Sequence, residues 1–312
     1  MKIKSFAILA LIAISACQAN IKINIGSGSH SAMYYPVASA LCEVFNEHNQ
    51  DKNIVCKANI SKGAEYNLNA IENGKIEMGI SQANLQYDAY MGYKQFAGNP
   101  HKKLRTLFGV HDEYLTIIAK KDSGINNFSD LRGKKVNIGN IGSGSRILFE
   151  QMIKKLGWKL EDFKEIYGET GSDINKVLCA TNKADAAVYI VGHPNKSFDS
   201  ILNNCDAKLV NLSADEIDKF VSLAPEDFFP TSIPSNFYKA NPNKIQTFAS
   251  KTILSVSENI DPKIVYNFVK IINENKDELV KKQPSLATID FFEKNNLKLA
   301  PKHQGVLEYF GY

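Results

Sequence analysis

The sequence predicts an α/β protein of two lobes, each with a mostly parallel sheet flanked by helices. Apolar segments typical of strands alternate with segments whose apolar residues recur at helical spacing, and this alternation is typical of parallel α/β sheets. The chain has 312 residues, which is more than a single hydrophobic core usually serves. Two glycine-rich segments, at 26–36 and 139–146, each separate a strand pattern from a helix pattern, which suggests one such loop per lobe.

The first twenty residues, MKIKSFAILALIAISACQAN, have the three-part layout of a secretory signal. Lys2 and Lys4 precede an apolar stretch at 6–14 that is shorter than the ~20 residues a spanning helix needs. We expect residues 1–19 to be a signal peptide and the mature protein to be periplasmic or otherwise extracytoplasmic. The tetrapeptide at 14–17 also resembles a bacterial lipobox, so two outcomes stay open. Either Cys17 is lipidated and tethers the protein to a membrane, or cleavage after Ala19 removes it.

The first α/β run follows the signal and is expected to form most of lobe I. It begins with a strand at 21–25 that ends in glycine. Pro36 is expected to open a helix with Val37, Leu41 and Phe45 on one face, because proline is tolerated in a first turn. The run continues with strands at 54–60, 77–81 and 105–110 and with helices at 64–73 and 85–92.

A second run begins with a strand at 114–120 and is expected to form lobe II. It has helix patterns at 128–132, 145–156, 174–181 and 196–202 and strand patterns at 135–138, 186–191 and 207–211. Strands near 231–238 and 246–256 and helices at 263–282 and 304–309 follow, and such final helices normally dock on a core already formed. We therefore expect lobe I to comprise 20–113 and 226–312, and lobe II to comprise 114–225. The chain would cross between lobes near 112–114 and again between 223 and 256.

Four cysteines remain after the signal: Cys42, Cys56, Cys179 and Cys205. An even number of cysteines in an oxidising compartment indicates disulfides. Three pairings are possible, and the spacing favours two local bridges, Cys42 to Cys56 and Cys179 to Cys205, which would leave the lobes free to move. A zinc site is the weaker alternative, because no two cysteines have ligand spacing.

Charge and motifs argue against several classes of function. The formal net charge is +4 and falls to about +2 without Lys2 and Lys4, whereas nucleic-acid binding usually needs a concentrated basic face. No serine stands in a Gly-x-Ser-x-Gly pattern, the paired thiols argue against a cysteine nucleophile, and no carboxylate cluster indicates acid–base catalysis. We therefore expect neither an enzyme nor a cofactor, and no nucleic-acid partner.

The two glycine-rich loops are candidate anion-binding sites. Residues 26–36 read GSGSHSAMYYP, and residues 139–146 read GNIGSGSR. A helix N-terminus offers free N–H groups and a favourable dipole to an anion, and open α/β sheets bind ligands at the carboxyl ends of their strands. Neither loop completes G-x-G-x-x-G, because Ser31 and Ile147 stand at the last positions, and neither is a Walker A loop. The alternative is that both loops are only tight turns.

Individual side chains near these strand ends could complete a site. Arg146 directly follows the second loop and is the best candidate for a carboxylate fork, with an internal salt bridge as the alternative. Gln82 ends a strand of lobe I, and Tyr189 and His193 lie at the end of a strand of lobe II. Their polar groups suit a polar ligand, although His193 could equally have a structural role.

These segments resemble the extracytoplasmic binding proteins of TAXI-type TRAP transporters. The likeness runs from about residue 24 to the C-terminus and includes GSGSHSAMYYPVASALCEVFN, CKANISKGAEYNLNAIENGKIEMGISQANLQYDAY, DSGINNFSDLRGKKVNIGNIGSGSR and LAPKHQGVLEYF. The resemblance implies a periplasmic-binding-protein type II-like fold with a two-crossing hinge that closes on its ligand. It also implies delivery of glutamate, glutamine or a dicarboxylate to TRAP membrane subunits, fused small and large, driven by an ion gradient.

On this basis we expect a monomeric receptor that binds a small organic anion or amino acid between its lobes, without a metal. The carboxylate would rest on the loop amides with Ser31, Ser143, Ser145 and Arg146. The full set of expected ligand-binding residues is Ser27, Ser31, Tyr34, Gly63, Tyr66, Asn67, Gln82, Asn140, Ser143, Ser145, Arg146, Tyr189 and His193. Two alternatives stay open: the binding protein of an ATP-driven importer, and a surface immunogenic lipoprotein without a transport role.

Overall fold

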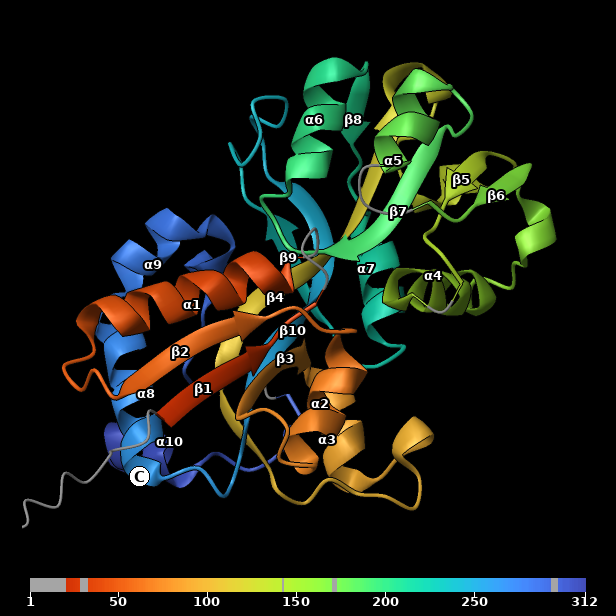
Figure 1. Ribbon diagram of the computed structural model, residues 1–312. Helices are drawn as coiled ribbons and strands as arrows, with labels where there is room; N and C mark the ends of the chain where they lie inside the picture. The colour runs from red at the N-terminus through yellow and green to blue at the C-terminus, as the bar shows by residue number, and fades with distance from the viewer. Residues whose placement is uncertain (1–20, 29–32, 142, 170–172, 293–296) are drawn as a thin grey trace, which may run out of the picture.

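The computed structural model of the protein describes residues 21–28, 33–141, 143–169, 173–292 and 297–312. Its ribbon forms two lobes, one built from the two ends of the chain and one from its middle (Figure 1). The expected signal peptide at 1–19, the candidate lipidation site Cys17 and the loop residue Ser31 lie outside the described residues. The predicted α/β class with two lobes is confirmed.

Ten strands form one mixed sheet within the described residues. They are β1 Ile21–Gly26, β2 Ile54–Asn59, β3 Met78–Gln82, β4 Leu104–Lys120, β5 Lys135–Asn137, β6 Glu165–Tyr167, β7 Ala186–Val191, β8 Ala207–Leu209, β9 Phe229–Ile233 and β10 Ile245–Ser257. Their order is β2-β1-β3-β10-β4-β7-β5-β6, with β8 beside β4 and β9 beside β10. The strands β2-β1-β3 are parallel, as are β7-β5-β6, so each end of the sheet is a parallel unit.

Helices cover both faces of each parallel unit (Figure 1). Lobe I combines β1–β3 with α1 Tyr34–His48, α2 Ala64–Glu72, α3 Ala83–Met91, α8 Pro262–Glu274, α9 Lys276–Lys282 and α10 Gln304–Phe310. Lobe II combines β5–β8 with α4 Gly144–Lys155, α5 Asp173–Asn175, α6 Lys196–Asn204 and α7 Ala214–Val221. Short 3-10 turns occupy Lys94–Phe96, Lys121–Ser123, Phe128–Leu131, Leu160–Asp162 and Pro284–Thr288, and Lys176–Ala180 is a short π-helix.

Two long strands carry the chain between the lobes. β4 has 17 residues and β10 has 13, and they pair antiparallel in the middle of the sheet. Separate strands at 105–110 and 114–120 were expected instead of β4, because His111, Asp112 and Glu113 interrupt the apolar pattern. The strand continues because these three side chains are buried and the backbone pairs with β10, Asp112 opposite Lys251. The predicted two-crossing hinge is therefore confirmed.

Element boundaries differ from the expectations in a few places. α1 begins at Tyr34 rather than Pro36, and Pro36 in its first turn needs no backbone N–H partner. The helix expected at 263–282 is α8 and α9, interrupted at Asn275. Neither β6 nor α7 was predicted, although α7 has a sequence signal: the Ser213 hydroxyl and the Glu216 carboxylate form a capping box at its start.

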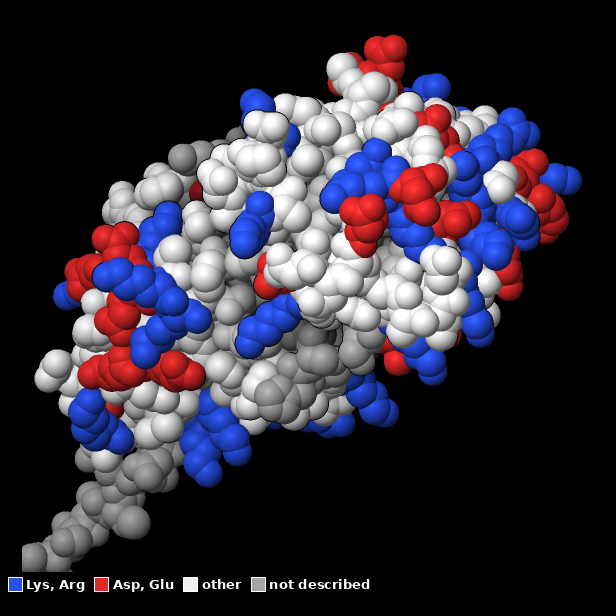
Figure 2. Space-filling view, turned by 90° about the horizontal axis from the view of Figure 1, so that it is seen from above, with Lys and Arg blue, Asp and Glu red and all other residues white. Residues whose placement is uncertain are grey.

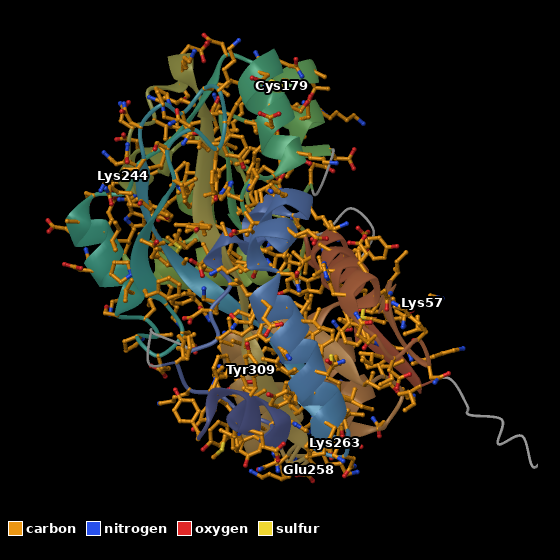
Figure 3. The ribbon with its side chains drawn as sticks, turned by 90° about the vertical axis from the view of Figure 1, so that its left-hand side faces the viewer. Lys57, Cys179, Lys244, Glu258, Lys263 and Tyr309 are labelled. Carbon is orange, nitrogen blue, oxygen red and sulfur yellow. A yellow bond between two sulfur atoms is a disulfide. The ribbon has the colours of Figure 1, made fainter. Side chains whose placement is uncertain are left out.

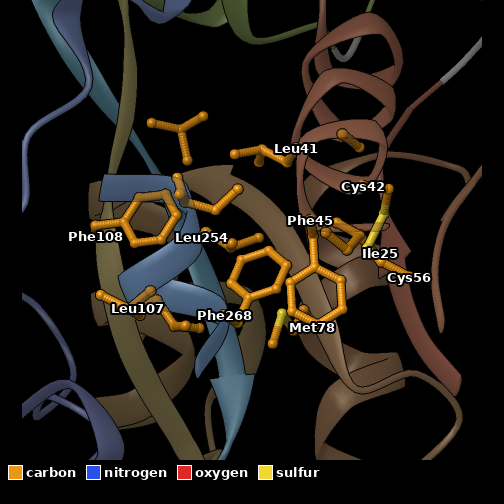
Figure 4. Close-up of a cluster of buried hydrophobic side chains, with 14 of the residues drawn as sticks. Ile25, Leu41, Cys42, Phe45, Cys56, Met78, Leu107, Phe108, Leu254 and Phe268 are labelled. Carbon is orange, nitrogen blue, oxygen red and sulfur yellow. A yellow bond between two sulfur atoms is a disulfide. The ribbon is translucent and has the colours of Figure 1, made fainter. Parts of the chain in front are cut away.

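The core of lobe I lies between the sheet and the helices α1 and α8 (Figure 4). Phe45 of α1 and Phe268 of α8 are fully buried, with ring centroids 5.1 Å apart. Burying one such side chain stabilises the fold by about 1.5–3 kcal/mol. Tyr309 of α10, which is labelled in Figure 3, packs edge-on against Tyr266 of α8 with ring centroids 5.4 Å apart. The C-terminal helices therefore return to lobe I because the core there needs them.

Both disulfides join elements of one lobe, as predicted. Cys42 of α1 is bonded to Cys56 of β2, and Cys179 is bonded to Cys205 at the end of α6. The first bridge is the yellow bond beside the core in Figure 4. Since neither bridge links the lobes, both leave the crossing strands free to act as a hinge.

The double variant Cys42→Ala/Cys56→Ala should lose about 3 kcal/mol of unfolding free energy, because the bridge closes a loop with a sequence separation of 14. Urea unfolding followed by circular dichroism measures the loss. Wild type treated with reductant is the control, and it should fall at least as far as the variant, since it loses both bridges. Equal urea midpoints for variant and oxidised wild type would contradict the prediction.

Candidate ligand-binding site between the lobes

A groove of about 600 Å³ lies between the two lobes. Lobe I contributes the first turns of α1 and the end of α9, including Tyr35 and Lys282. Lobe II contributes residues 194–197 at the start of α6. A second hollow of about 340 Å³, near Gly74 and Ser257, is lined by lobe I and the end of β10. A solute there would not touch lobe II, so the interlobe groove is the better candidate for a site that responds to lobe movement.

The surface seen from above has mixed charge. Lysine and arginine side chains are interspersed with acidic ones over the face shown in Figure 2. Lys282 at the rim of the groove is one example, because its ammonium group pairs with Glu47 at 3.0 Å and with Glu43 at 3.6 Å. Charge at this rim is therefore largely compensated within the protein, and the chemistry of the groove must be sought at its inner end.

The two lobes touch beside Met33, one of the residues that line the groove, and we call this place the inner end of the groove. Gly192 follows β7 of lobe II, and a Cβ placed on it would come within 3.0 Å of His111 Cδ2 and 3.1 Å of Met33 Cγ. Met33 also lines the groove itself. Tyr34, in the first turn of α1, packs edge-on against His111 with ring centroids 6.0 Å apart. The missing side chain at Gly192 thus allows lobe II to approach the crossing strand closely.

A carboxylate is buried beside this contact. Glu113 of β4 is 7% exposed, and Gln82 Nε2, at the end of β3, donates a hydrogen bond to it at 3.2 Å. Burial raises the pKa of Glu113 to about 7, while Gln82 and the Tyr34 hydroxyl act in the opposite direction. Burial, together with the charge of Glu113, raises the pKa of Tyr34 well above its usual value. Gln82 and Tyr34, both expected at the site, are therefore brought together around Glu113.

His111 contributes a further polar group at the same place. One ring nitrogen, Nδ1, lies 3.0 Å from the Thr252 hydroxyl, while Nε2 is buried without a hydrogen-bond partner. Burial, with the nearby charge of Lys251, lowers the pKa of His111 to about 3, so its ring is neutral at physiological pH.

The glycine-rich loop of lobe II uses its polar groups internally. The Ser143 hydroxyl caps α4 by accepting from the Arg146 N–H at 3.3 Å, and the Ser145 hydroxyl accepts from the Ile190 N–H at 3.1 Å. Arg146 Nε donates to the Glu150 carboxylate at 2.8 Å, the internal salt bridge that was the alternative to a carboxylate fork. Asn140 is exposed. The described polar side chains of this loop therefore serve to cap α4 and to join it to β7.

Tyr189 and His193 are buried and bonded within lobe II. Tyr189 accepts from Asn137 Nδ2 at 3.0 Å and donates to the Glu169 carbonyl oxygen. His193 Nε2 lies 2.7 Å from the Thr116 hydroxyl, and Nδ1 bonds the Tyr238 hydroxyl. The structure thus gives both side chains internal partners, the structural role that was the alternative for His193.

The remaining expected residues of lobe I hold its first loop in place. Asn67 Nδ2 donates to the carbonyl oxygens of Ser27 at 2.7 Å and of Ile80 at 2.9 Å. The Asn67 side chain fits because Gly26 and Gly79 carry no Cβ. A Cβ on Gly26 would lie 2.5 Å from Asn67 Oδ1, and one on Gly79 would lie 2.9 Å from Asn67 Cβ. The Ser27 hydroxyl donates to the Asn59 carbonyl oxygen at 2.7 Å. Gly63 precedes α2 and has a positive φ of 99°, and Tyr66 is exposed, so neither reaches the inner end of the groove.

Sequence reasoning missed Glu113 and His111. Both stand in the run TLFGVHDEYLTII, whose apolar flanks predict a buried strand. A charged pair in the middle of such a run was the available signal, because an ionisable residue in a buried strand usually has a partner or a function.

A comparison with protein-family models shows to which family the chain belongs. The model of the NMT1-like family matches residues 25–311, which is most of the chain. The chain belongs to the NMT1-like family. The expected membership of the TAXI-type TRAP receptors is therefore wrong, and the fused small and large TRAP subunits expected as membrane partners lose their basis.

Solved structures share the fold at low sequence identity. The probable amino-acid ABC transporter extracellular-binding protein of Bacillus subtilis superposes with a TM-score of 0.52 at 14% identity, over 85% of this chain and 97% of that one. A periplasmic sulfonate-binding protein of Methylobacillus flagellatus superposes with a TM-score of 0.50 at 15% identity, over 84% of this chain and 73% of that one. A Xanthomonas citri protein solved with bound ATP superposes with a TM-score of 0.51 at 10% identity, over 88% of this chain and 92% of that one. The periplasmic-binding-protein type II-like fold is confirmed.

The family and the fold neighbours agree with the fold expected from the sequence, whereas the TRAP-specific part of the expected function has no support in them. No helix in the described part of the chain has both the length and the apolarity to cross a membrane.

Proposed function

We propose that this NMT1-like protein is the solute receptor of an ATP-driven importer, which captures a small organic solute between its lobes and delivers it to a membrane permease. The observation that carries the proposal is a groove lined by both lobes, with buried polar groups at its inner end. The fold neighbours described above support the ATP-driven class, because those of amino-acid and sulfonate type are named as transporter binding proteins.

The solute is a small amino acid or a related carboxylate or sulfonate. Polar groups that combine a hydroxyl, an amide and a carboxylate suit a ligand with both donors and acceptors. Glutamate and glutamine of the expected ligand set fit this description. A dicarboxylate without an amino group fits less well, because it would bring two negative charges and no positive one to the buried Glu113.

Closure follows from contacts with both lobes. We assign the chain up to residue 113 and the C-terminal helices α8–α10 to lobe I, and the middle of the chain to lobe II, joined by β4 and β10. The expected second boundary at 226 moves into β10, because Phe229, Tyr238 and Ile245 pack in the core of lobe II. A solute that touches Tyr34 in lobe I and the segment after Gly192 in lobe II binds the closed arrangement better than the open one. That difference in affinity is sufficient to shift the population toward closure.

Thermal-shift screening of the mature protein tests the receptor function. At 100 times its dissociation constant, a true ligand stabilises the protein by about 2.7 kcal/mol, which raises the melting temperature measurably. We expect at least one amino acid, carboxylate or sulfonate to do so. If none does, a surface lipoprotein without a transport role becomes the better explanation.

Uptake measurements test the energy source. Cells that carry the transporter should lose uptake of the identified solute when ATP is depleted and retain it when the ion gradient is collapsed at constant ATP. The opposite pattern would contradict an ATP-driven importer while leaving the receptor function intact.

A further inference from the structure

The crossing strand β4 presents an incompletely bonded carboxylate at the inner end of the groove. Glu113 is almost fully buried, and Gln82 Nε2 is its hydrogen-bond donor at 3.2 Å. Among the described residues, no lysine, arginine or histidine lies within ion-pairing distance of it. An ionised carboxylate accepts about four hydrogen bonds, and burying it without a charged partner is costly.

The preceding residue of the same strand is a carboxylate that has a charged partner. Asp112 is also buried, but it forms an ion pair with Lys251 of β10, which is 4% exposed. Lys251 Nζ donates in addition to the Thr288 carbonyl oxygen at 2.9 Å. Since successive strand residues face opposite sides of a sheet, the cation that serves Asp112 is not available to Glu113.

Two further polar atoms lie close to the Glu113 carboxylate. The Tyr34 hydroxyl is buried with Glu113 as its polar neighbour, and His111 Nε2 is buried without a hydrogen-bond partner. The charge of Glu113 acts on the Tyr34 hydroxyl, and the Tyr34 and His111 rings are in edge contact. Gly192 of lobe II covers this place, since a Cβ on it would lie 3.3 Å from His111 Nε2. Buried polar groups in native proteins are usually bonded, so this cluster points to a missing ligand.

We propose that Glu113 selects solutes that carry a protonated nitrogen, an ammonium or amidinium group, with Gln82 and Tyr34 completing its surroundings. The inference rests on the proposed receptor function and specifies its solute class. A ligand cation would supply the charge that no described side chain supplies. His111 cannot do so because its ring stays neutral, and Lys251 is held by Asp112.

This assignment has a consequence for pH. A cation binds the ionised carboxylate, and burial places the pKa of Glu113 at about 7 in the protein without ligand. Affinity should therefore fall as the pH drops below 7, by up to about tenfold per pH unit. The neighbouring groups that face Glu113 stay neutral from pH 5 to 8: Tyr34 because its pKa is raised, and His111 because its pKa is about 3. The Asp112–Lys251 pair lies on the opposite face of the strand.

Matched pairs of solutes test the proposal by isothermal titration calorimetry at pH 8. Each pair differs by one amino group: L-glutamate and glutarate, L-alanine and propionate, taurine and ethanesulfonate. We expect the aminated member of at least one pair to bind wild type and its partner to bind at least 100-fold more weakly. Glu113→Gln should weaken the aminated ligand by a similar factor. Glu161→Gln, which changes an exposed carboxylate of lobe II, should bind like wild type.

Melting temperatures separate lost binding from lost folding. Glu113→Gln should melt at or above wild type at pH 8, because an amide replaces a buried charge. If it fails to fold, Glu113→Asp keeps the charge and should show an intermediate loss of affinity. Deaminated ligands that bind wild type equally well, or unchanged affinity in Glu113→Gln, would overturn the role of Glu113 and leave the receptor function standing. Binding of neither member of any pair would overturn both proposals.

Discussion

Gly192→Leu should hold the two lobes apart and weaken solute binding by about 5–150-fold. Even the first carbon of a side chain at this position would approach His111 Cδ2 to 3.0 Å and Met33 Cγ to 3.1 Å, and leucine adds three more. Overpacking of this kind costs about 1–3 kcal/mol, and under the proposed closure mechanism this cost falls on the closed state, in which Gly192 lies against Met33 of lobe I. A coupling of that size corresponds to the stated change in affinity.

Two measurements check whether the leucine of Gly192→Leu holds the two lobes apart. Calorimetry gives the affinity for the solute identified by thermal shift, and small-angle scattering should give a larger radius of gyration for the variant with solute present. Gly192→Ala is the graded control: its neighbours need to move by only a few tenths of an ångström, so its affinity should lie close to that of wild type. A leucine variant with wild-type affinity and scattering would mean that the lobes do not close at this contact.

Lys251→Met should be the most destabilising change at the hinge, at about 3–5 kcal/mol. The ammonium group of Lys251 is buried, pairs with Asp112 and donates to the Thr288 carbonyl oxygen. Removing one partner of a buried ion pair leaves an uncompensated charge, which costs more than the pair contributes as a whole. Urea unfolding of the mature protein measures the loss.

The pH dependence and a double variant identify the cause of the Lys251 effect. Burial already raises the pKa of Asp112, with Lys251 acting in the opposite direction, so the loss of Lys251 raises that pKa further. The unfolded chain then releases its proton at a lower pH than the folded protein does, and the deficit of Lys251→Met should be smaller at pH 4 than at pH 8. Lys251→Met/Asp112→Leu should recover much of the loss. A deficit that is the same at both pH values would contradict an unpaired Asp112.

Local features of the chain were predictable because their causes are local. Alternating strand and helix patterns report which face each element buries, so most of the strands and helices of both lobes follow from short windows of sequence. The bridge from Cys42 to Cys56 joins neighbouring elements, and the short sequence separation of 14 residues is what favours this pairing. We expected two strands in place of β4, because the segment from His111 to Glu113 is polar. The strand is continuous because the backbone of this buried segment pairs with β10.

The candidate site was less predictable because hydrogen-bond partners come from distant elements. Gln82 and Tyr34 were expected to bind the ligand, and the structure brings both side chains together beside Glu113, which was not expected. Ser145 and Asn67 were equally plausible as ligand contacts, yet their polar atoms bond backbone groups 45 and 40 residues away. The spacing of residues in the sequence does not reveal such distant partners. A hydroxyl that is free and one that is hydrogen-bonded therefore cannot be told apart from the sequence.

The sequence by itself predicted the α/β alternation and the two crossings between lobes, and its cysteine spacing favoured the two local bridges, since each depends on residues close together in the chain or on their pattern. The tertiary structure alone decided which polar groups have partners. It gives the Ser27 and Ser143 hydroxyls internal hydrogen bonds and, among the described residues, leaves Glu113 without a cationic partner where β4 passes between the lobes. The physical reason is that burial and pairing depend on which residues folding brings together across the sheet. Under the proposed function, the affinity for the solute depends on the polar groups that folding leaves without partners.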